Sequence, residues 1–250
     1  MLSAFFIFLV KAMIHDNLAK ILMTIAQTAK KAGRNPDDIK LVAVSKMVGV
    51  DLMRQAMENG QMLFGENYLQ EAAEKISFFP PGITWHFIGH LQSNKAKQAV
   101  ELFDVIETVD RWKIAKALDN QSKVLKKKLS ILIQINTGRE KQKSGVLPEE
   151  AETLLHQIAQ ETDLHVLGLM TIPPFFLDPE KSRPYFRELR KLAKRFATLN
   201  LFADNTHVEL SMGMSNDFQV AIEEGATLVR VGTALFGARN FSAPRPLVAD

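Results

Sequence analysis

The chain has 250 residues, of which 46% are hydrophobic and 24% are charged, and its formal net charge is +3. This composition is that of a globular protein, and the length suits one large α/β domain. The chain has no cysteine, which excludes disulfides, thiolate metal sites and a thiol nucleophile.

The start of the chain differs from the rest. Residues 2–10 are apolar except Ser3, and a stretch of nine residues cannot span a bilayer. It also lacks the charged start and the cleavage site of a signal peptide. We therefore expect no membrane insertion. We interpret residues 1–12 as an extension, either disordered or a misassigned start, followed by a single domain over residues 13–250.

Hydrophobic periodicity predicts strands that alternate with helices along the whole domain. The strands are expected at residues 39–45, 61–64, 84–88, 104–108, 129–135, 164–169, 207–210 and 227–231. The helices are expected at residues 14–32, 50–59, 68–78, 94–102, 111–126, 148–160, 185–199 and 217–224, with a long proline-rich loop at 173–184. Strict alternation implies parallel strands joined by right-handed crossovers, and eight such units fit a (β/α)₈ TIM barrel. An open doubly wound sheet is the alternative, but no Gly-x-Gly-x-x-Gly follows the first strand.

Lys46 comes directly after the buried-strand pattern Leu41–Ser45. The carboxyl ends of the strands of a barrel meet at one mouth, where ligands bind, so this lysine would present an amine there. Most lysines at strand ends only extend into solvent, so Lys46 alone is weak evidence.

The loops after the last two strands contain glycine and hydroxyl groups. They are Ser211-Met212-Gly213 and Gly232-Thr233. Barrels often bind phosphate with these two loops, because glycine lets the backbone approach an anion and free N–H groups complete the site. The alternative is that both glycines only permit turns.

Arg230 lies within the last predicted strand. Alternation places it on one face with Leu228, and Val229 and Val231 on the other. A buried arginine needs a partner. We expect either a structural ion pair, with Glu209 or another nearby acid, or contact with a ligand at the barrel axis.

An amine, a phosphate cradle and an inward arginine together suit pyridoxal 5′-phosphate (PLP). Lys46 would form the Schiff base, the cradle would hold the phosphate, and Arg230 would face the pyridine nitrogen. A positive neighbour disfavours protonation of that nitrogen and so weakens the cofactor as an electron sink. The pattern predicts a cofactor holder or a restrained racemase. The histidines show no metal-ligand spacing, so no metal site is expected.

At these residues the chain resembles the pyridoxal phosphate homeostasis proteins. The matching blocks run in family order and are Ala43–Lys46, Phe64–Glu71, Trp85–Lys95, Lys143–Gly145, Gly168–Met170, Leu210–Ser215, Val229–Thr233 and Phe236–Gly237. The resemblance implies a barrel like the N-terminal domain of alanine racemase. The chain departs from the family after the lysine, where Met47-Val48-Gly49 replaces a run with threonine and then proline, which puts the geometry of this loop in question.

The resemblance also implies roles for single residues. Lys46 would carry PLP as an internal aldimine, and Arg230 would contact the pyridine nitrogen. The phosphate ligands would lie at Ser211, with the adjoining Met212, and at Gly232 and Thr233, and the pocket lining would include Asn67 and His86.

The family's implied role is cytoplasmic PLP (vitamin B6) homeostasis without established turnover. We expect a monomer whose partners are PLP and cofactor-free PLP enzymes. Two other functions stay open. One is a PLP-dependent racemase, which needs a second base, and Tyr68 and Tyr185 are the only tyrosines. The other is an aldolase that uses Lys46 without a cofactor; it would stay colourless with added PLP.

Overall fold

The computed structural model describes residues 2–237, with side chains from residue 13 onward. Its strands form a closed barrel in the order β1 to β8, and every neighbouring pair is parallel. The strands are β1 (Lys40–Val44), β2 (Leu63–Glu66), β3 (Thr84–Phe87), β4 (Val105–Val109), β5 (Ser130–Ile135), β6 (His165–Thr171), β7 (Glu209–Ser211) and β8 (Leu228–Val231). This confirms the predicted (β/α)₈ barrel.

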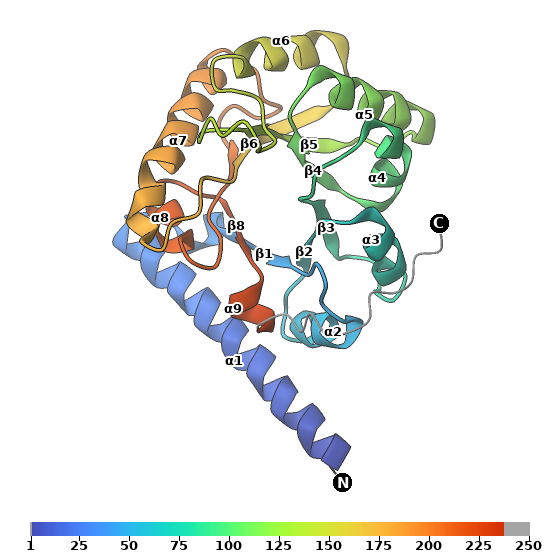
Figure 1. Cartoon of the computed structure of the whole chain (residues 1–250), viewed down its shortest axis with the longest axis vertical. Helices are drawn as coiled ribbons and strands as arrows, with labels where there is room; N and C mark the ends of the chain where they lie inside the picture. The colour runs from blue at the N-terminus through green and yellow to red at the C-terminus, as the bar shows by residue number, and fades with distance from the viewer. Residues whose placement is uncertain (1, 238–250) are drawn as a thin grey trace.

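The helices surround the strands, as Figure 1 shows. They are α1 (Leu2–Lys31), α2 (Val50–Glu58), α3 (Leu69–Ile76), α4 (Ala96–Leu102), α5 (Trp112–Leu125), α6 (Ala151–Glu161), α7 (Arg183–Thr198), α8 (Phe218–Glu223) and α9 (Thr233–Phe236). Short 3₁₀ turns lie at Pro36–Asp38, Ser93–Lys95 and Pro179–Ser182.

Helix α1 is part of the outer ring of helices. It packs beside α8 and α9 (Figure 1). One stripe of α1 is buried, formed by Ile14, Leu18, Ile21, Ile25 and Ala29, which recur at the three- and four-residue spacing of a helix face. Asn17 fixes the contact by donating from Nδ2 to the carbonyl of Leu235 at 3.0 Å.

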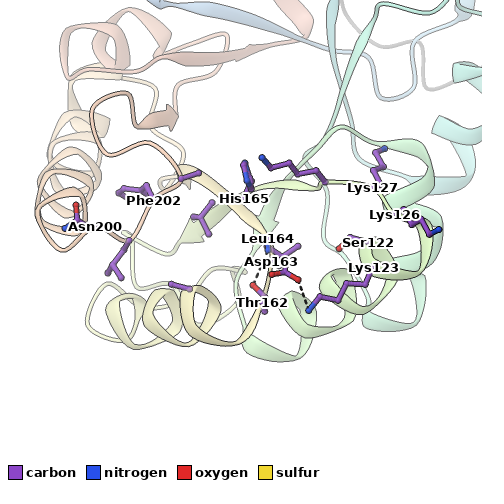
Figure 2. Close-up of a pocket in the computed structure, with 15 residues that line it drawn as sticks. Ser122, Lys123, Lys126, Lys127, Thr162, Asp163, Leu164, His165, Asn200 and Phe202 are labelled. Atoms are coloured by element: carbon purple, nitrogen blue, oxygen red, sulfur yellow. Dashed lines mark hydrogen bonds and ion pairs between the residues drawn. The ribbon is translucent and has the colours of Figure 1, made fainter.

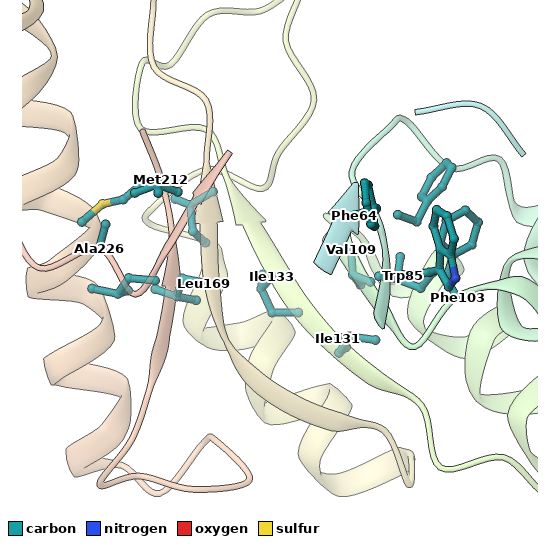
Figure 3. Close-up of a cluster of buried hydrophobic side chains, with 14 of the residues drawn as sticks. Phe64, Trp85, Phe103, Val109, Ile131, Ile133, Leu169, Met212 and Ala226 are labelled. Carbon is teal, nitrogen blue, oxygen red and sulfur yellow. The ribbon is translucent and has the colours of Figure 1, made fainter. Parts of the chain in front are cut away.

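The apolar core has two parts. The barrel interior holds a small cluster of Val42, Val105, Leu132, Met170 and Leu228. The larger part lies between the barrel and the helices, and Figure 3 shows a section of it that includes Phe64 and Trp85. These two rings stack with their centroids 5.5 Å apart. Alternate residues of each strand therefore face the interior and the helices.

Several predicted boundaries are wrong. The largest difference is at the first helix, which begins at Leu2 and not at residue 14. Three others lie at a glycine or proline. Strand β2 continues through Gly65, where a Cβ would lie 2.8 Å from Cγ1 of Val42, so this glycine permits close packing and does not end the strand. Pro148 lies in a turn before α6. Pro184 belongs to the first turn of α7, where its missing N–H has no helical partner to lose.

The interpretation of residues 1–12 stays a prediction. The backbone from Leu2 onward belongs to α1. Of the predicted domain, residues 238–250 lie outside the described part. Among the described residues, no helix is long and apolar enough to cross a membrane.

Gly89 provides a test of how closely the segments after β2 and β3 pack. A Cβ on Gly89 would lie 2.1 Å from the backbone oxygen of Asn67. We expect Gly89→Ser to lower the free energy of unfolding by about 1–3 kcal/mol, because backbone would have to move. Chemical denaturation measures the loss.

The control is Gly49→Ser. Gly49 has φ −67°, and a Cβ at this position would meet no described atom within 4 Å. This change should stay within about 0.5 kcal/mol, since serine also suits the start of a helix. Equal losses at the two positions would contradict the packing argument.

Candidate functional site

Lys46 lies at the carboxyl end of the barrel and on its interior side. Along β1, Val42 belongs to the interior cluster, while Leu41 and Ala43 belong to the outer core. Continuing this alternation turns Val44 and then Lys46 inward. Lys46 is partly buried. The structure therefore places the predicted Schiff-base lysine at the mouth.

Arg230 also faces the interior, from the neighbouring strand β8. It is the register partner of Val42, so Lys46 lies two interior positions further toward the mouth. The outward neighbours Val229 and Val231 are both fully buried in the outer core. The alternation predicted for this strand is confirmed, and the amine and the guanidinium belong to the same end of one interior space.

A buried polar network holds Arg230. The Nη1 group of Arg230 donates to Oγ of Ser211 at 2.6 Å, and Nη2 donates to the carbonyl of Thr171 at 2.8 Å. Ser211 in turn donates to Oε2 of Glu107 at 2.5 Å. The other oxygen of Glu107 lies 2.6 Å from Nδ1 of His86. The network joins strands across the barrel, and Glu107 at its centre has no exposed surface.

The charges in this network depend on one another. Burial alone would raise the pKa of Glu107, but the hydrogen bond and charge of His86, the charge of Arg230 and the Ser211 hydroxyl together hold that pKa below its ordinary value. Burial lowers the pKa of Arg230, against the charges of Glu107 and Asp217. A guanidinium stays protonated in proteins, so the centre of the barrel holds an ionised acid and a cation.

The partner of Arg230 is Glu107, with 3.9 Å between Nη1 and Oε2, and not Glu209. Glu209 begins β7 at the opposite end of the barrel and pairs with Lys40 at 2.8 Å. Sequence analysis missed Glu107. Its signal was an acid at an interior position of the strand after His86, in a segment that is otherwise apolar or β-branched.

Asn67 lies at the mouth, immediately after β2. Gly65 faces the interior, as its contact with Val42 shows, so alternation turns Asn67 inward as well. The Oδ1 atom of Asn67 is buried and has no hydrogen-bond partner among the described residues. Buried polar atoms are rarely left unpaired, so this oxygen is suited to a ligand group.

The loops after β7 and β8 approach each other at the same mouth. Gly213 has φ +88°, and a Cβ there would lie 2.5 Å from Cβ of Ala221, so only glycine fits. Its carbonyl accepts the N–H of Arg230 at 3.0 Å. A Cβ on Gly232 would lie 3.3 Å from the carbonyl oxygen of Val44. At both positions a side chain would crowd neighbouring protein atoms, so the two glycines let these loops pack closely; their contact with a phosphate stays a prediction.

Three of the residues predicted to bind phosphate differ in whether their side chains are available at the mouth. Thr233 lies at the mouth, with its Oγ1 3.3 Å from Oγ of Ser215, beside Gly232. The Ser211 hydroxyl is instead committed to Glu107 and Arg230. Met212 is fully buried in the outer core beside Ala226 (Figure 3). Phosphate contact by Ser211 and Met212 would therefore use their backbone, and it stays a prediction.

A hollow of about 650 Å³ lies at the other end of the barrel, before β5 and β6 (Figure 2). Two of its lysines have partners within the protein. Lys123 pairs with Asp163 at 3.1 Å, and Lys127 donates to the carbonyls of Val100 and Phe103 at 2.9 and 2.8 Å. This hollow is remote from Lys46. No group of acids and histidines in the described part of the chain could hold a metal ion.

Comparisons with known proteins agree with this fold. The family model for the alanine racemase N-terminal domain matches residues 17–240. The alanine racemase of Clostridium difficile 630 shares the fold, with a TM-score of 0.69 at 16% identity over 89% of this chain and 57% of that one. The fold and the matching family model thus define a barrel of the alanine racemase N-terminal type.

More similar proteins define the family. The pyridoxal phosphate homeostasis protein of Vibrio cholerae is 41% identical over 234 residues, which is 92% of this chain and 98% of that protein, and that of Escherichia coli K12 is 41% identical over 237 residues, with the same coverage. PipY of Synechococcus elongatus, solved with PLP bound, has a TM-score of 0.77 at 35% identity, over 90% of this chain and all of that one. The chain belongs to the pyridoxal phosphate homeostasis protein family.

The network predicts how stability depends on pH. The lowered pKa of Glu107 means that its ionised form stabilises the fold fully above the ordinary value of 4.5, and that this contribution is lost as pH falls through the lowered pKa. Glu107→Gln should therefore cost about 3 kcal/mol near neutral pH, and the difference from wild type should shrink below pH 4.5. Urea unfolding at several pH values measures it.

Glu74→Gln is the control, because Glu74 is exposed. It should change stability by less than about 0.5 kcal/mol. A Glu107→Gln difference that grows with acidity would show that Glu107 is protonated in the folded protein.

Proposed function

We propose that this protein binds PLP as a Schiff base on Lys46 and serves intracellular PLP homeostasis. The observation that carries the proposal is that Lys46 follows β1 at the carboxyl end of the barrel, four residues beyond Val42, which is the register partner of Arg230. An aldehyde can react with Lys46 while an aromatic nitrogen meets Arg230. The names of the relatives and the PLP bound to PipY support it.

The residues at the mouth fit this cofactor. The unpaired Oδ1 of Asn67 offers an acceptor for a hydroxyl group. Gly232 offers its backbone, and Thr233 its hydroxyl group, to the phosphate. Both belong to the loop after β8, which lies close to Val44. PLP, when bound, supplies an aldehyde and a conjugated ring that can stabilise negative charge. His86, which was also predicted to line the pocket, lies below the mouth. Its Nδ1 atom is 2.6 Å from Oε1 of Glu107.

Arg230 is suited to hold the cofactor and restrain its chemistry. Two of its five N–H donors are used by Ser211 and Thr171, so the group is fixed in place. Its charge opposes protonation of a nearby pyridine nitrogen. Aminotransferase-type chemistry relies on an acidic partner at that nitrogen. The acid here, Glu107, is instead paired with Arg230, with 3.9 Å between Oε2 and Nη1.

A racemase has no specific support in the structure. Tyr185 stacks on Phe176, with centroids 5.9 Å apart, in the segment around the start of α7. Tyr68 follows Asn67 and is 54% exposed. Alternation turns Tyr68 away from the interior, so neither tyrosine is placed as the second base that racemisation needs. An aldolase without cofactor fits the PLP-bound relative less well.

The first test is chemical trapping. Borohydride reduction of PLP-loaded protein should leave a pyridoxyl group on the peptide that contains Lys46, detected by mass spectrometry, and Lys46→Ala should abolish it. Lys141→Ala is the matched control, since Lys141 is exposed in the loop after β5 at the same end of the barrel. An adduct that persists in Lys46→Ala, or that depends on Lys141, would refute the assignment.

The second test separates a carrier from an enzyme. We propose a cytoplasmic monomer whose recipients are cofactor-free PLP enzymes. The loaded protein should restore activity to a cofactor-free aminotransferase faster than the equilibrium release of PLP allows. It should not racemise any of a panel of L-amino acids. Chiral chromatography of the reaction mixtures measures this. Sustained racemisation that disappears in Lys46→Ala would favour the racemase.

A further inference from the structure

The segment that carries Lys46 is a tight and strained turn. The carbonyl of Ser45 accepts the N–H of Val48 at 3.0 Å, which closes a turn with Lys46 and Met47 at its centre. Met47 has φ +58°, a left-handed conformation that suits glycine and is sparsely populated by other residues. Such a conformation persists only where the surroundings hold it.

The surroundings that hold the turn are a buried ionic cluster on the outer side of the barrel. We define the Lys75 cluster as Ser45, Glu66, Glu71 and Lys75. Lys75 comes from α3 and is only 7% exposed. Its Nζ donates to the carbonyl of Ser45 at 2.6 Å and to Oε1 of Glu66 at 2.9 Å, and it also contacts the carboxylate of Glu71.

The same cluster grips both neighbours of Lys46 in the chain. On one side, the Ser45 hydroxyl donates to Oε1 of Glu66 at 2.7 Å, in addition to the bond from Lys75 to the Ser45 carbonyl. On the other side, the N–H of Met47 donates to Oε1 of Glu71 at 2.5 Å. Lys46 thus lies between two residues that the Lys75 cluster anchors on the outer side of the barrel.

The composition of the cluster indicates that it does more than pack α3 against the barrel. A buried cation is matched by two carboxylates, and Oε2 of Glu66 has no hydrogen-bond partner among the described residues. Burial raises the pKa of Glu66, and Lys75 opposes that rise. Buried ion clusters are costly to assemble and are weak devices for stability alone. What this one does is fix the backbone on either side of Lys46.

We propose that Lys75, with Glu66 and Glu71, is a positioning residue that aims the amine of Lys46 at the cofactor aldehyde. This rests on the proposed role of Lys46. The cluster lies on the helix side of β1 and β2, so it acts through the backbone of the turn and does not touch the cofactor. A reacting group that is held in place captures its partner faster and binds it more tightly, because less freedom is lost on reaction.

The first test uses Glu71, which is partly exposed and so less critical for folding. Glu71→Ala removes the acceptor for the N–H of Met47, while Glu71→Gln keeps an acceptor oxygen there. Stopped-flow absorbance with added PLP should show Schiff-base formation slowed by about 10- to 100-fold in Glu71→Ala. Glu71→Gln should retain most of the wild-type rate. Equal rates in the two variants would overturn the proposal.

The second test compares the buried Lys75 with Lys127, which is partly buried. Lys75→Met removes the centre of the cluster, and Lys127→Met removes another lysine that donates to two backbone carbonyls, at the far end of the barrel. Both should lower thermal stability, but only Lys75→Met should raise the Kd for PLP, by at least about tenfold. Similar Kd values in the two variants would show that Lys75 has a structural role only. If Lys75→Met does not fold, the Glu71 pair decides.

The proposal can fail separately from the function on which it rests. Borohydride mapping of the wild-type protein tests whether Lys46 carries PLP before any variant is compared. With that established, labelling of Lys46 by an amine reagent in PLP-free protein gives an independent measure. The rate at which the reagent labels Lys46 should differ from wild type in Glu71→Ala. The same rate should stay near wild type in Glu71→Gln and Lys127→Met.

Discussion

The buried pair of Glu107 and Arg230 is the interaction on which the interior of this barrel depends. A guanidinium with almost no exposed surface to hydrate it requires an acid, and Glu107 provides one through Ser211 and by charge. His86 satisfies the remaining oxygen of that acid. The network shares the barrel interior with the apolar cluster, whose members Val42 and Met170 are register partners of Arg230 and Ser211. Whatever binds at the mouth meets a fixed positive charge.

Much of this could be read from the sequence, because it depends on local periodicity. Alternation along Leu228–Val231 fixes which face Arg230 occupies, and the order of strands and helices fixes the barrel. The partner of Arg230 could not be found this way. Glu209 is near in sequence, but strand β7 starts at the opposite end of the barrel, whereas Glu107 reaches the same level from the far side.

Other differences have the same origin in tertiary contacts. Gly65 looks like a strand breaker, yet it is needed where Val42 fills the interior. The short helix α9 has no periodic signal of its own. The hydroxyl of Ser211 has the chemistry of an anion ligand, but the barrel commits it to Glu107. The departure after Lys46 leaves a regular helix start, since Gly49 has φ −67°, the angle that proline itself would impose.

The position of α1 has a consequence for how the molecule assembles. Asn17 contacts Leu235, which is 218 residues further along the chain, and β1 pairs with β8. The barrel therefore cannot close until the last strand is available, and its closing contacts join segments of very large sequence separation. Such topologies fold slowly, because the entropy of a long loop is lost before the contacts form. On the ribosome, the part of the first helix that packs on α8 and α9 would stay uncovered until these helices have been synthesised.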